Sequence, residues 1–243
     1  MKNENMKITN KQVLHRLRIK YGKKDRLKFI SHLDLISTLE RALRRARLPF
    51  VLTQGFNPRA KLSYGPPLPI GIDSESEYVD IFLSKKLDLK EVTSRINLTL
   101  PDGLHVFRAG YIQLNEPSIT KFIDRAKYRI EIKILATDLD DVQCLINKLL
   151  SKKELRFLKR GKEKKIFTQE AVFSIQIVER KLDRIVLEVL LSIGDQGEIR
   201  PDILIELLFD GFKSGMDYEI LGIYRIGMYA KIGNELHCPL DTR

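Results

Sequence analysis

The stretch from Gln54 to Gly71 most constrains the fold of this chain, because it holds three glycines and four prolines. Proline fixes φ and lacks an amide donor, whereas glycine frees the backbone, so the segment fits neither a regular helix nor a central strand. We expect a shaped loop, with a short strand over 61–64 as an alternative for part of it. Such loops often carry binding residues on a rigid scaffold.

Basic residues are concentrated in the first third of the chain. The 243 residues carry a net charge of +11. Residues 1–72 hold 16 basic and 4 acidic residues, which gives +12, and the remainder therefore carries −1. This asymmetry predicts a surface for a polyanion, and nucleic acid is the usual polyanion partner. The alternative is a solvated basic surface that only aids solubility.

The composition also limits which cellular compartment and which kinds of catalytic or metal site can be expected. Cys144 and Cys238 fit no metal-ligand spacing and no disulfide framework, which favours a reducing compartment. No run reaches the roughly 18 apolar residues of a membrane span, and residues 1–10 lack an apolar signal core. We expect a cytoplasmic protein away from membranes, with no metal and no cofactor. No Walker loop, nucleophile elbow or dinucleotide fingerprint is present.

The apolar pattern predicts the order β-α-β-β-α-β within residues 13–114. Ser31 is a typical N-cap with Asp34 three positions later, and Pro49 ends the helix that follows. The predicted strands are 13–21 (extended or paired by 27–30), 50–53, 78–83 and 104–111, and the helices are 32–47 and 88–98. This order is that of a ferredoxin-like fold, with two helices on one antiparallel sheet.

The same order recurs after a linker predicted over residues 115–126. Strands are predicted at 127–135, 171–179, 184–191 and 218–230, and helices at 138–150 and 200–209. We therefore expect an α+β protein of tandem ferredoxin-like domains, 13–114 and 127–243, behind a disordered tail over 1–12. Between two of these elements, Lys152–Lys165 holds 8 basic and 2 acidic residues and is expected to be a helix end and a mobile loop. A solvated charge run is favoured for it, and an arm that contacts phosphates is the alternative.

The first helix combines an apolar face with arginines. Its apolar residues recur at helical spacing, at Leu33, Ile36, Leu39, Leu43 and Ala46. At about 100° per residue, Arg41, Arg44 and Arg45 lie on a flank away from that face. Guanidinium groups bind phosphates through paired hydrogen bonds, so this flank suits an RNA backbone. The alternative is a solvated face on which Glu40 pairs with Arg44.

The loop offers groups that suit bases and phosphates. Gly55 permits close approach of the backbone, and Gln54 and Asn57 offer donors and acceptors to base edges. Stacking faces come from Phe56 and Tyr64, and positive charge from Arg59 and Lys61. The alternative is a compact connection packed by its own prolines.

His32 has two interpretations. It lies near the apolar side of the first helix, where a first-turn histidine that bonds the neighbouring loop is the structural interpretation. The catalytic one is a general base acting on a 2′-hydroxyl or a water. CRISPR repeat-processing endonucleases also pair ferredoxin-like domains and use a histidine near the first helix, which is an analogy of architecture.

Several motifs resemble a known family. They are Phe29–Leu35 (FISHLDL), Arg41–Ala46 (RALRRA), Gln54–Pro58 (QGFNP), Gly65–Gly71 (GPPLPIG) and Glu77–Asp80 (EYVD), with weaker matches at Gly197–Asp202 and Arg225–Gly227. Together they resemble the bacterial radical-SAM-linked family of unknown function, whose members stand alone or are fused behind a cobalamin-type radical-SAM protein. The family often has His-Pro where Arg59-Ala60 stands here, so a histidine role at that point is in doubt.

The resemblance implies an accessory to a radical-SAM enzyme. The chain lacks a Cys-x-x-x-Cys-x-x-Cys motif and cannot hold that enzyme's iron–sulfur cluster, so the radical-SAM partner must be a separate polypeptide. We expect an RNA-binding module for tRNA or rRNA without its own catalysis. The alternatives are a metal-independent endoribonuclease that uses His32 and a protein-only scaffold for the radical-SAM partner.

Overall fold

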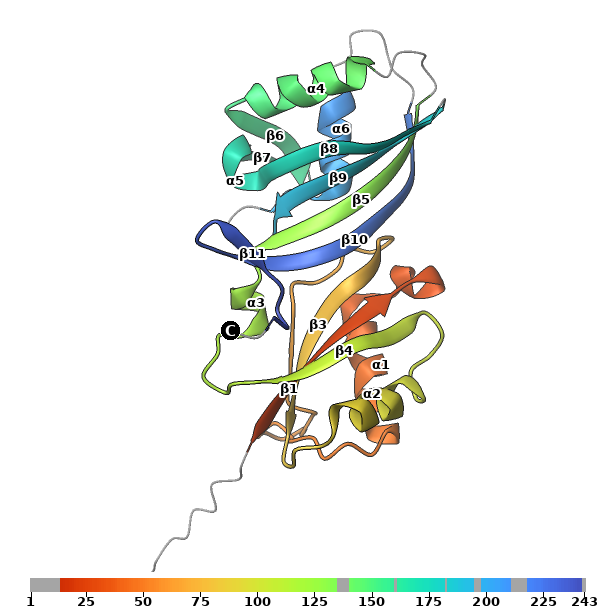
Figure 1. The fold of residues 1–243 in the computed structure, drawn as a ribbon, viewed down its shortest axis with the longest axis vertical. Helices are drawn as coiled ribbons and strands as arrows, with labels where there is room; N and C mark the ends of the chain where they lie inside the picture. Colours follow the sequence, from red (N-terminus) through yellow and green to blue (C-terminus); the bar gives the residue numbers. More distant parts are fainter. Residues whose placement is uncertain are drawn as a thin grey trace, which may run out of the picture.

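The computed structural model describes residues 14–134, 140–159, 161–181, 183–194, 198–210 and 218–241. These residues form an elongated molecule, with the N-terminal half at one end of its long axis and the C-terminal half at the other (Figure 1). The predicted tail over 1–12 lies outside the described residues. None of the described helices is long and apolar enough to cross a membrane.

The N-terminal half is built on three long strands and two helices. Its elements are β1 (His15–Lys23), the 3-10 helix η1 (Asp25–Phe29), α1 (His32–Arg45), β2 (Leu62–Tyr64), β3 (Asp73–Leu83), α2 (Leu89–Asn97) and β4 (Leu104–Ile112). Antiparallel pairing joins β1 to both β3 and β4, and β2 pairs antiparallel with β3. The strand order of this half is therefore β4-β1-β3-β2.

The C-terminal half has the same connectivity of its long strands. Its elements are α3 (Ile119–Phe122), β5 (Arg125–Ile134), α4 (Asp140–Ser151), β6 (Glu154–Lys159), β7 (Lys162–Phe167), α5 (Thr168–Ala171), β8 (Val172–Lys181), β9 (Arg184–Ser192), α6 (Pro201–Phe209), β10 (Tyr218–Ile232) and β11 (Glu235–His237). Strand β5 pairs antiparallel with β10 and β9, and β9 with β8. The order β10-β5-β9-β8 repeats that of the first half, with a separate β6–β7 hairpin added.

One continuous sheet joins the halves, in the order β4-β1-β3-β10-β5-β9-β8. The junction is a short parallel pairing of β10 with β3, in which Tyr224 lies opposite Asp73 and Arg225 opposite Ser74. Each half keeps its own apolar core, one built around Leu17, Leu43 and Ile81 and the other around Ile130, Leu187 and Leu204. The predicted α+β class with a mostly antiparallel sheet is confirmed.

Helix α1 begins as its sequence predicts and buries most of its predicted apolar face. The Ser31 hydroxyl accepts a hydrogen bond from the Asp34 amide at 3.2 Å, so Ser31 is the N-cap. Leu39, Leu43 and Ala46 are buried as predicted, but Leu33 is 73% exposed. Leu35, which is 3% exposed, begins the buried stripe instead.

Three predicted segments adopt other structures. The strand expected over residues 50–53 forms two isolated bridges, Phe50 with Leu83 and Leu52 with Ala60, and β2 is the strand that the alternative for 61–64 predicted. The expected strand at 27–30 is the 3-10 helix η1, because Asp25 adopts a φ of 55° and its amide bonds the Asp73 carboxylate, which turns the chain away from β1. The expected loop over 152–165 is the β6–β7 hairpin. Leu155 is buried in the C-terminal core, with Phe157 and Ile166 packed against it, and Gly161 makes the turn at a φ of 73°.

Candidate functional site

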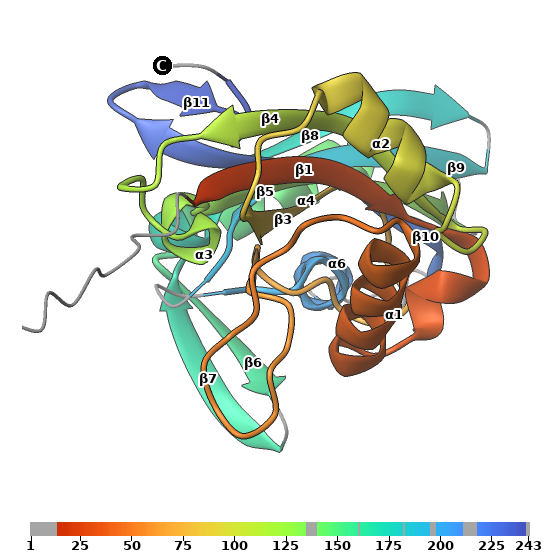
Figure 2. The same ribbon diagram turned by 90° about the horizontal axis from the view of Figure 1, so that it is seen from below.

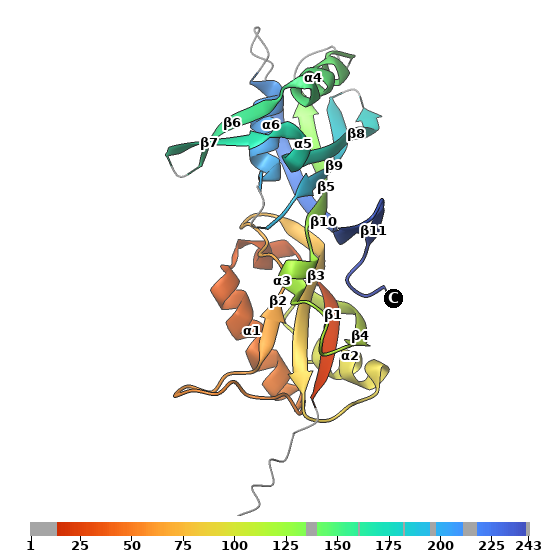
Figure 3. The same ribbon diagram turned by 90° about the vertical axis from the view of Figure 1, so that its left-hand side faces the viewer.

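Residues 50–61, here called the loop arm, form a narrow projection between α1 and β2. The amide of Thr53 donates to the carbonyl of Arg59 at 2.7 Å, and the amide of Lys61 donates to the carbonyl of Val51 at 2.7 Å. A further amide bond, from Val51 to the carbonyl of Phe82, ties the arm to β3. The arm projects from the side of the molecule on which α1 lies (Figure 3).

The tip of the loop arm holds most of the loop residues expected to contact RNA. Gln54, Gly55, Phe56 and Asn57 are all exposed, and the Phe56 ring has no cover at all. Gly55 adopts a φ of 145°, which suits glycine, and no atom lies within 4 Å of where a Cβ would stand. A fully exposed aromatic ring on a projecting arm is available for stacking.

The arginines of α1 divide between two directions. The guanidinium of Arg44 lies 5.4 Å from the centroid of Phe50, at the root of the loop arm. By contrast, Arg45 donates to the carbonyl of Thr99 at 2.6 Å, beyond the end of α2. Arg41 is exposed. Arg44 therefore adjoins the loop arm, with the exposed Arg41 three residues before it on α1, whereas Arg45 is turned toward α2.

Lys61 lies apart from these arginines. Its ammonium group stands 4.8 Å from the centroid of the Phe82 ring on β3. The next residue, Leu62, packs against the core beneath α1, and neighbouring residues of an extended segment point to opposite faces. The structure thus leaves Lys61 on the other face of the sheet, and the same alternation places Arg59, two residues earlier, on the side of Lys61.

Within the described residues, these cations have no carboxylate partner. No ion pair there involves Arg41, Arg44, Arg45, Arg59 or Lys61, and the pairing of Glu40 with Arg44, which was the alternative interpretation, is not formed. We define the basic face as Arg41, Arg44 and the loop-arm tip, residues 54–57. Its charges remain available to an external anion.

Part of the early positive charge is internal, which the sequence did not indicate. Arg16 and Arg18 are 4% and 3% exposed, and both bind the buried carboxylate of Asp80, each at 2.6 Å. The guanidinium of Arg16 also donates to the carbonyls of Glu116 and Pro117, and that of Arg18 to the carbonyl of Pro239. These two arginines hold the segment after β4 and the C-terminal segment against the sheet, so they are structural.

A second buried polar group, here called the junction cluster, lies where β3 meets β10. It consists of Lys23, Ser74, Glu77 and Arg225. The Arg225 guanidinium contacts the Glu77 carboxylate at 3.2 Å and donates to the carbonyls of Pro66 and Pro67. Ser74 donates to the same carboxylate at 2.6 Å. The cluster therefore binds the Gly/Pro segment, residues Gly65–Gly71, to the sheet and links the two halves of the sheet.

His32 stands beside this cluster with little space around it. Its ring meets the Tyr64 ring edge-on at 5.6 Å, and burial lowers the pKa of His32. The cavity that it shares with Lys23, Tyr64 and Glu77 has a volume of about 10 Å³. That is room for about one water molecule, too little for a nucleotide.

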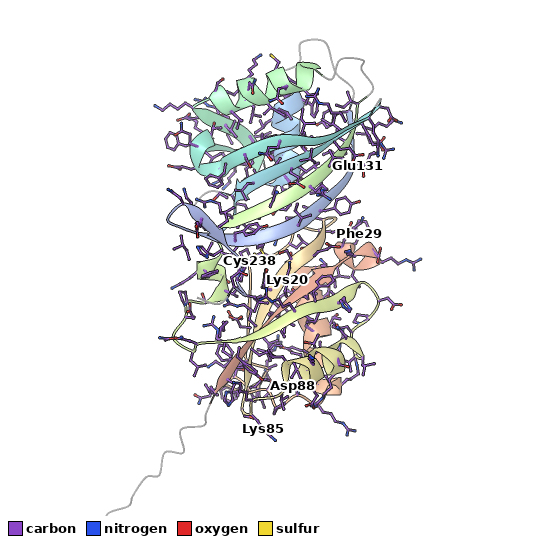
Figure 4. The ribbon with its side chains drawn as sticks, viewed as in Figure 1. Lys20, Phe29, Lys85, Asp88, Glu131 and Cys238 are labelled. Atoms are coloured by element: carbon purple, nitrogen blue, oxygen red, sulfur yellow. The ribbon has the colours of Figure 1, made fainter. Side chains whose placement is uncertain are left out.

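The cysteine nearest the sheet is unsuited to nucleophilic chemistry. Cys238 lies next to Lys20 of β1 (Figure 4), yet burial and the neighbouring Asp241 carboxylate raise the pKa of its thiol. A thiol with a raised pKa is a weak nucleophile near neutral pH. Within the described residues, no three His, Cys, Asp or Glu side chains gather as metal ligands.

The fold is similar to part of a chain in solved complexes that contain Cbf5 and Nop10. A chain of a Cbf5–Nop10–Gar1 complex superposes with a TM-score of 0.50 at 10% identity, covering 87% of this chain and 48% of that one. A chain of the archaeal box H/ACA sRNP Nop10–Cbf5 complex gives a TM-score of 0.44 at 11% identity, covering 86% and 46%. The chain thus spans about half the length of these structures, and at such identity the likeness concerns the fold alone.

The sequence family is clear from a match over most of the chain. None of the curated proteins matches this sequence. Residues 16–201 match the family described as uncharacterized proteins conserved in bacteria (DUF2344). That description names no radical-SAM enzyme, so the radical-SAM partner stays a prediction from the resemblance. The match includes α1, the loop arm and the Gly/Pro segment, and the chain belongs to this bacterial family.

Proposed function

We propose that this protein is an RNA-binding module, without catalysis of its own, that presents a structured RNA such as tRNA or rRNA to a separate radical-SAM enzyme in the cytoplasm. The observation that carries the proposal is the basic face, whose guanidinium groups have no carboxylate partner among the described residues. Phosphates attract such groups, and RNA-binding proteins combine them with exposed aromatic rings that stack on bases. Phe56 is such a ring.

The architecture supports this use of the surface. We propose that the two halves, 13–114 and 127–243, are ferredoxin-like domains, because the four strands β4-β1-β3-β2 of the first half and β10-β5-β9-β8 of the second follow the same order. Residues 115–126, proposed as the linker, include α3 and the first residues of β5. In this arrangement α1 and the loop arm lie on the outside of the first domain, where a large ligand can reach them.

Catalysis by His32 has less support. The histidine faces a cavity for about one water, and the Gly/Pro segment that closes it is held by Arg225. A general base must lie within hydrogen-bond reach of the proton it removes. We therefore propose that His32 is structural and positions the Tyr64 ring through their edge-on contact. Endoribonuclease activity is one of the outcomes that the test distinguishes.

The test is a salt titration of RNA binding by fluorescence anisotropy. The logarithm of the binding constant falls with the logarithm of salt concentration by about 0.7 to 0.9 per phosphate contact. We expect Arg41→Ala/Arg44→Ala to flatten that slope by about 1.4 to 1.8. The control Lys90→Ala/Lys231→Ala, which removes two exposed lysines outside the basic face, one from the first turn of α2 and one from β10, should leave the slope unchanged.

Three results would oppose the proposal. Equal slopes for the wild type and the Arg41→Ala/Arg44→Ala variant would remove the basic face from RNA binding. Cleavage of the RNA that disappears in His32→Ala would favour the endoribonuclease. Co-purification with a radical-SAM protein after complete nuclease treatment, without any RNA affinity, would favour the protein-only scaffold.

A further inference from the structure

We propose that the β6–β7 hairpin is a second RNA-binding arm, and that it and the loop arm grip one base-paired RNA at two separate points. This inference rests on the proposed function and identifies the kind of RNA involved. We call residues 152–167 the hairpin arm.

The two arms occupy equivalent places in the two halves. In the N-terminal half, the loop arm lies between the first helix, α1, and the second strand, β2. In the C-terminal half, the hairpin arm lies between the first helix, α4, and the strand β8, which holds the place of β2 in the repeated strand order. Because corresponding connections leave a repeated fold at corresponding positions, the architecture supplies two projections rather than one.

Both arms project to the same side of the molecule. They extend to the left of the sheet in Figure 3, one above the other along the long axis. Seen from below in Figure 2, the loop arm and the β6–β7 hairpin extend together toward the bottom of the view. The two views agree, so a ligand that lies along this side can meet both arms.

The hairpin arm is anchored by its base and charged at its end. Leu155 is 2% exposed in the C-terminal core, and Phe157 and Ile166 pack against that core. Lys162 lies beyond this base, and Lys164 and Lys165 lie alongside it, opposite Phe157 and Arg156. All three lysines are exposed and take no part in an ion pair among the described residues. Because these apolar residues fix the hairpin on the core, its lysines are held at defined positions relative to the rest of the fold.

The charge of the hairpin arm matches a polyphosphate. Residues 152–165 hold 8 basic and 2 acidic residues, a net charge of +6 on a projection of two short strands. Lysine binds phosphate as a point charge and reads no sequence, so this arm suits the backbone of the RNA. By contrast, the loop arm carries Phe56 and Asn57, which suit an unpaired base.

The separation of the arms favours a folded RNA. Strand β8, which follows the hairpin arm, lies four strand spacings from β3, about 19 Å at about 4.8 Å per spacing. The loop arm is bonded to β3 at Phe82, at the far end of β3 from its pairing with β10, so the arms are at least that far apart. A base-paired stem is stiff enough to hold two backbone segments at that distance. A single strand would have to be ordered along the whole surface at a cost in conformational entropy.

The experiment compares two RNA hairpins that end in the same unpaired loop. One has a stem of roughly 16 base pairs, the length that shape-reading RNA domains span, and the other a stem of roughly 4. The hairpin-arm variant is Lys162→Ala/Lys164→Ala, and Lys90→Ala/Lys231→Ala is again the control, on α2 and beside β11 at the opposite side of Figure 3. Circular dichroism confirms that each variant is folded, and Lys153→Ala/Lys165→Ala serves as a second hairpin-arm variant.

On the long stem we expect the hairpin-arm variant to flatten the salt slope by about 1.4 to 1.8, and on the short stem to match the control. If the hairpin-arm variants match the control on the long stem while Arg41→Ala/Arg44→Ala still weakens binding, the second arm is wrong and the proposed function stands. If the hairpin-arm variants weaken both stems equally, the arm binds RNA but no two-point grip exists. If neither arm matters, both proposals fall.

Discussion

Removing the Arg225 guanidinium tests whether the junction cluster stabilises the fold. Arg225 is fully buried and contacts one carboxylate and two carbonyls, those of Glu77, Pro66 and Pro67. In Arg225→Met an apolar chain fills the space, while Glu77 keeps only the Ser74 hydroxyl and the field of Lys23. Breaking a buried ion pair costs about 3 to 5 kcal/mol, and because Lys23 remains nearby we expect about 3 kcal/mol.

The assay is urea denaturation followed by circular dichroism, with an exposed arginine as the control. Arg129→Met removes a pairing with Glu188 in which the arginine side chain is 53% exposed, and such pairs contribute about 0 to 1 kcal/mol. Adding Glu77→Gln to Arg225→Met should recover about 1 kcal/mol or more, because residues in direct contact are energetically coupled. Equal free energies of unfolding for Arg225→Met and Arg129→Met, or additive effects of the two junction substitutions, would refute this reasoning.

Four further outcomes are expected. Because burial lowers the pKa of His32, stability is complete above the unfolded value of about 6.5 and declines as the pH falls through it; an NMR titration midpoint at or above that value would contradict this. Asp80→Asn leaves two buried arginines without a counter-ion and should cost about 3 to 5 kcal/mol in urea denaturation, and a loss below about 1 kcal/mol would oppose it. Gly103→Ala should lower the melting temperature more than Gly161→Ala, because both have positive φ but only the first brings a Cβ to 2.8 Å from a carbonyl oxygen; the reverse order would argue against this account. Phe56→Ala should leave stability unchanged and weaken RNA binding by about 1 to 3 kcal/mol, and unchanged affinity would exclude stacking.

Local patterns in the sequence predicted the elements well. The Ser31 cap and the Asp88 cap begin α1 and α2 as expected, because a side-chain oxygen bonding a nearby amide is a local interaction. The face of α1 was predicted less well. Leu33 and Leu35 are both leucines, and only the position of the sheet decides which one is buried.

The long-range arrangement of charge was beyond the sequence. The charge count included Arg16 and Arg18 among the cations available at the surface. Both form buried ion pairs with Asp80, which lies 64 and 62 positions later in the chain. Nothing local marks Arg225 as the partner of Glu77 either. In residues 152–165 the abundance of lysine hid the alternation of Leu155 and Phe157, which place the hairpin's base against the core.

The parallel contact between β10 and β3 has a consequence for synthesis on the ribosome. Domains assemble from the N-terminus as the chain emerges, but the strand that completes the shared sheet is β10 (Tyr218–Ile232), which follows the whole first half and most of the second. Until β10 is synthesised, Arg225 is absent, so the Glu77 carboxylate lacks its buried partner and the carbonyls of Pro66 and Pro67 lack the donor that fixes them. The nascent first half therefore exposes polar groups that are buried only after β10 has paired with β3.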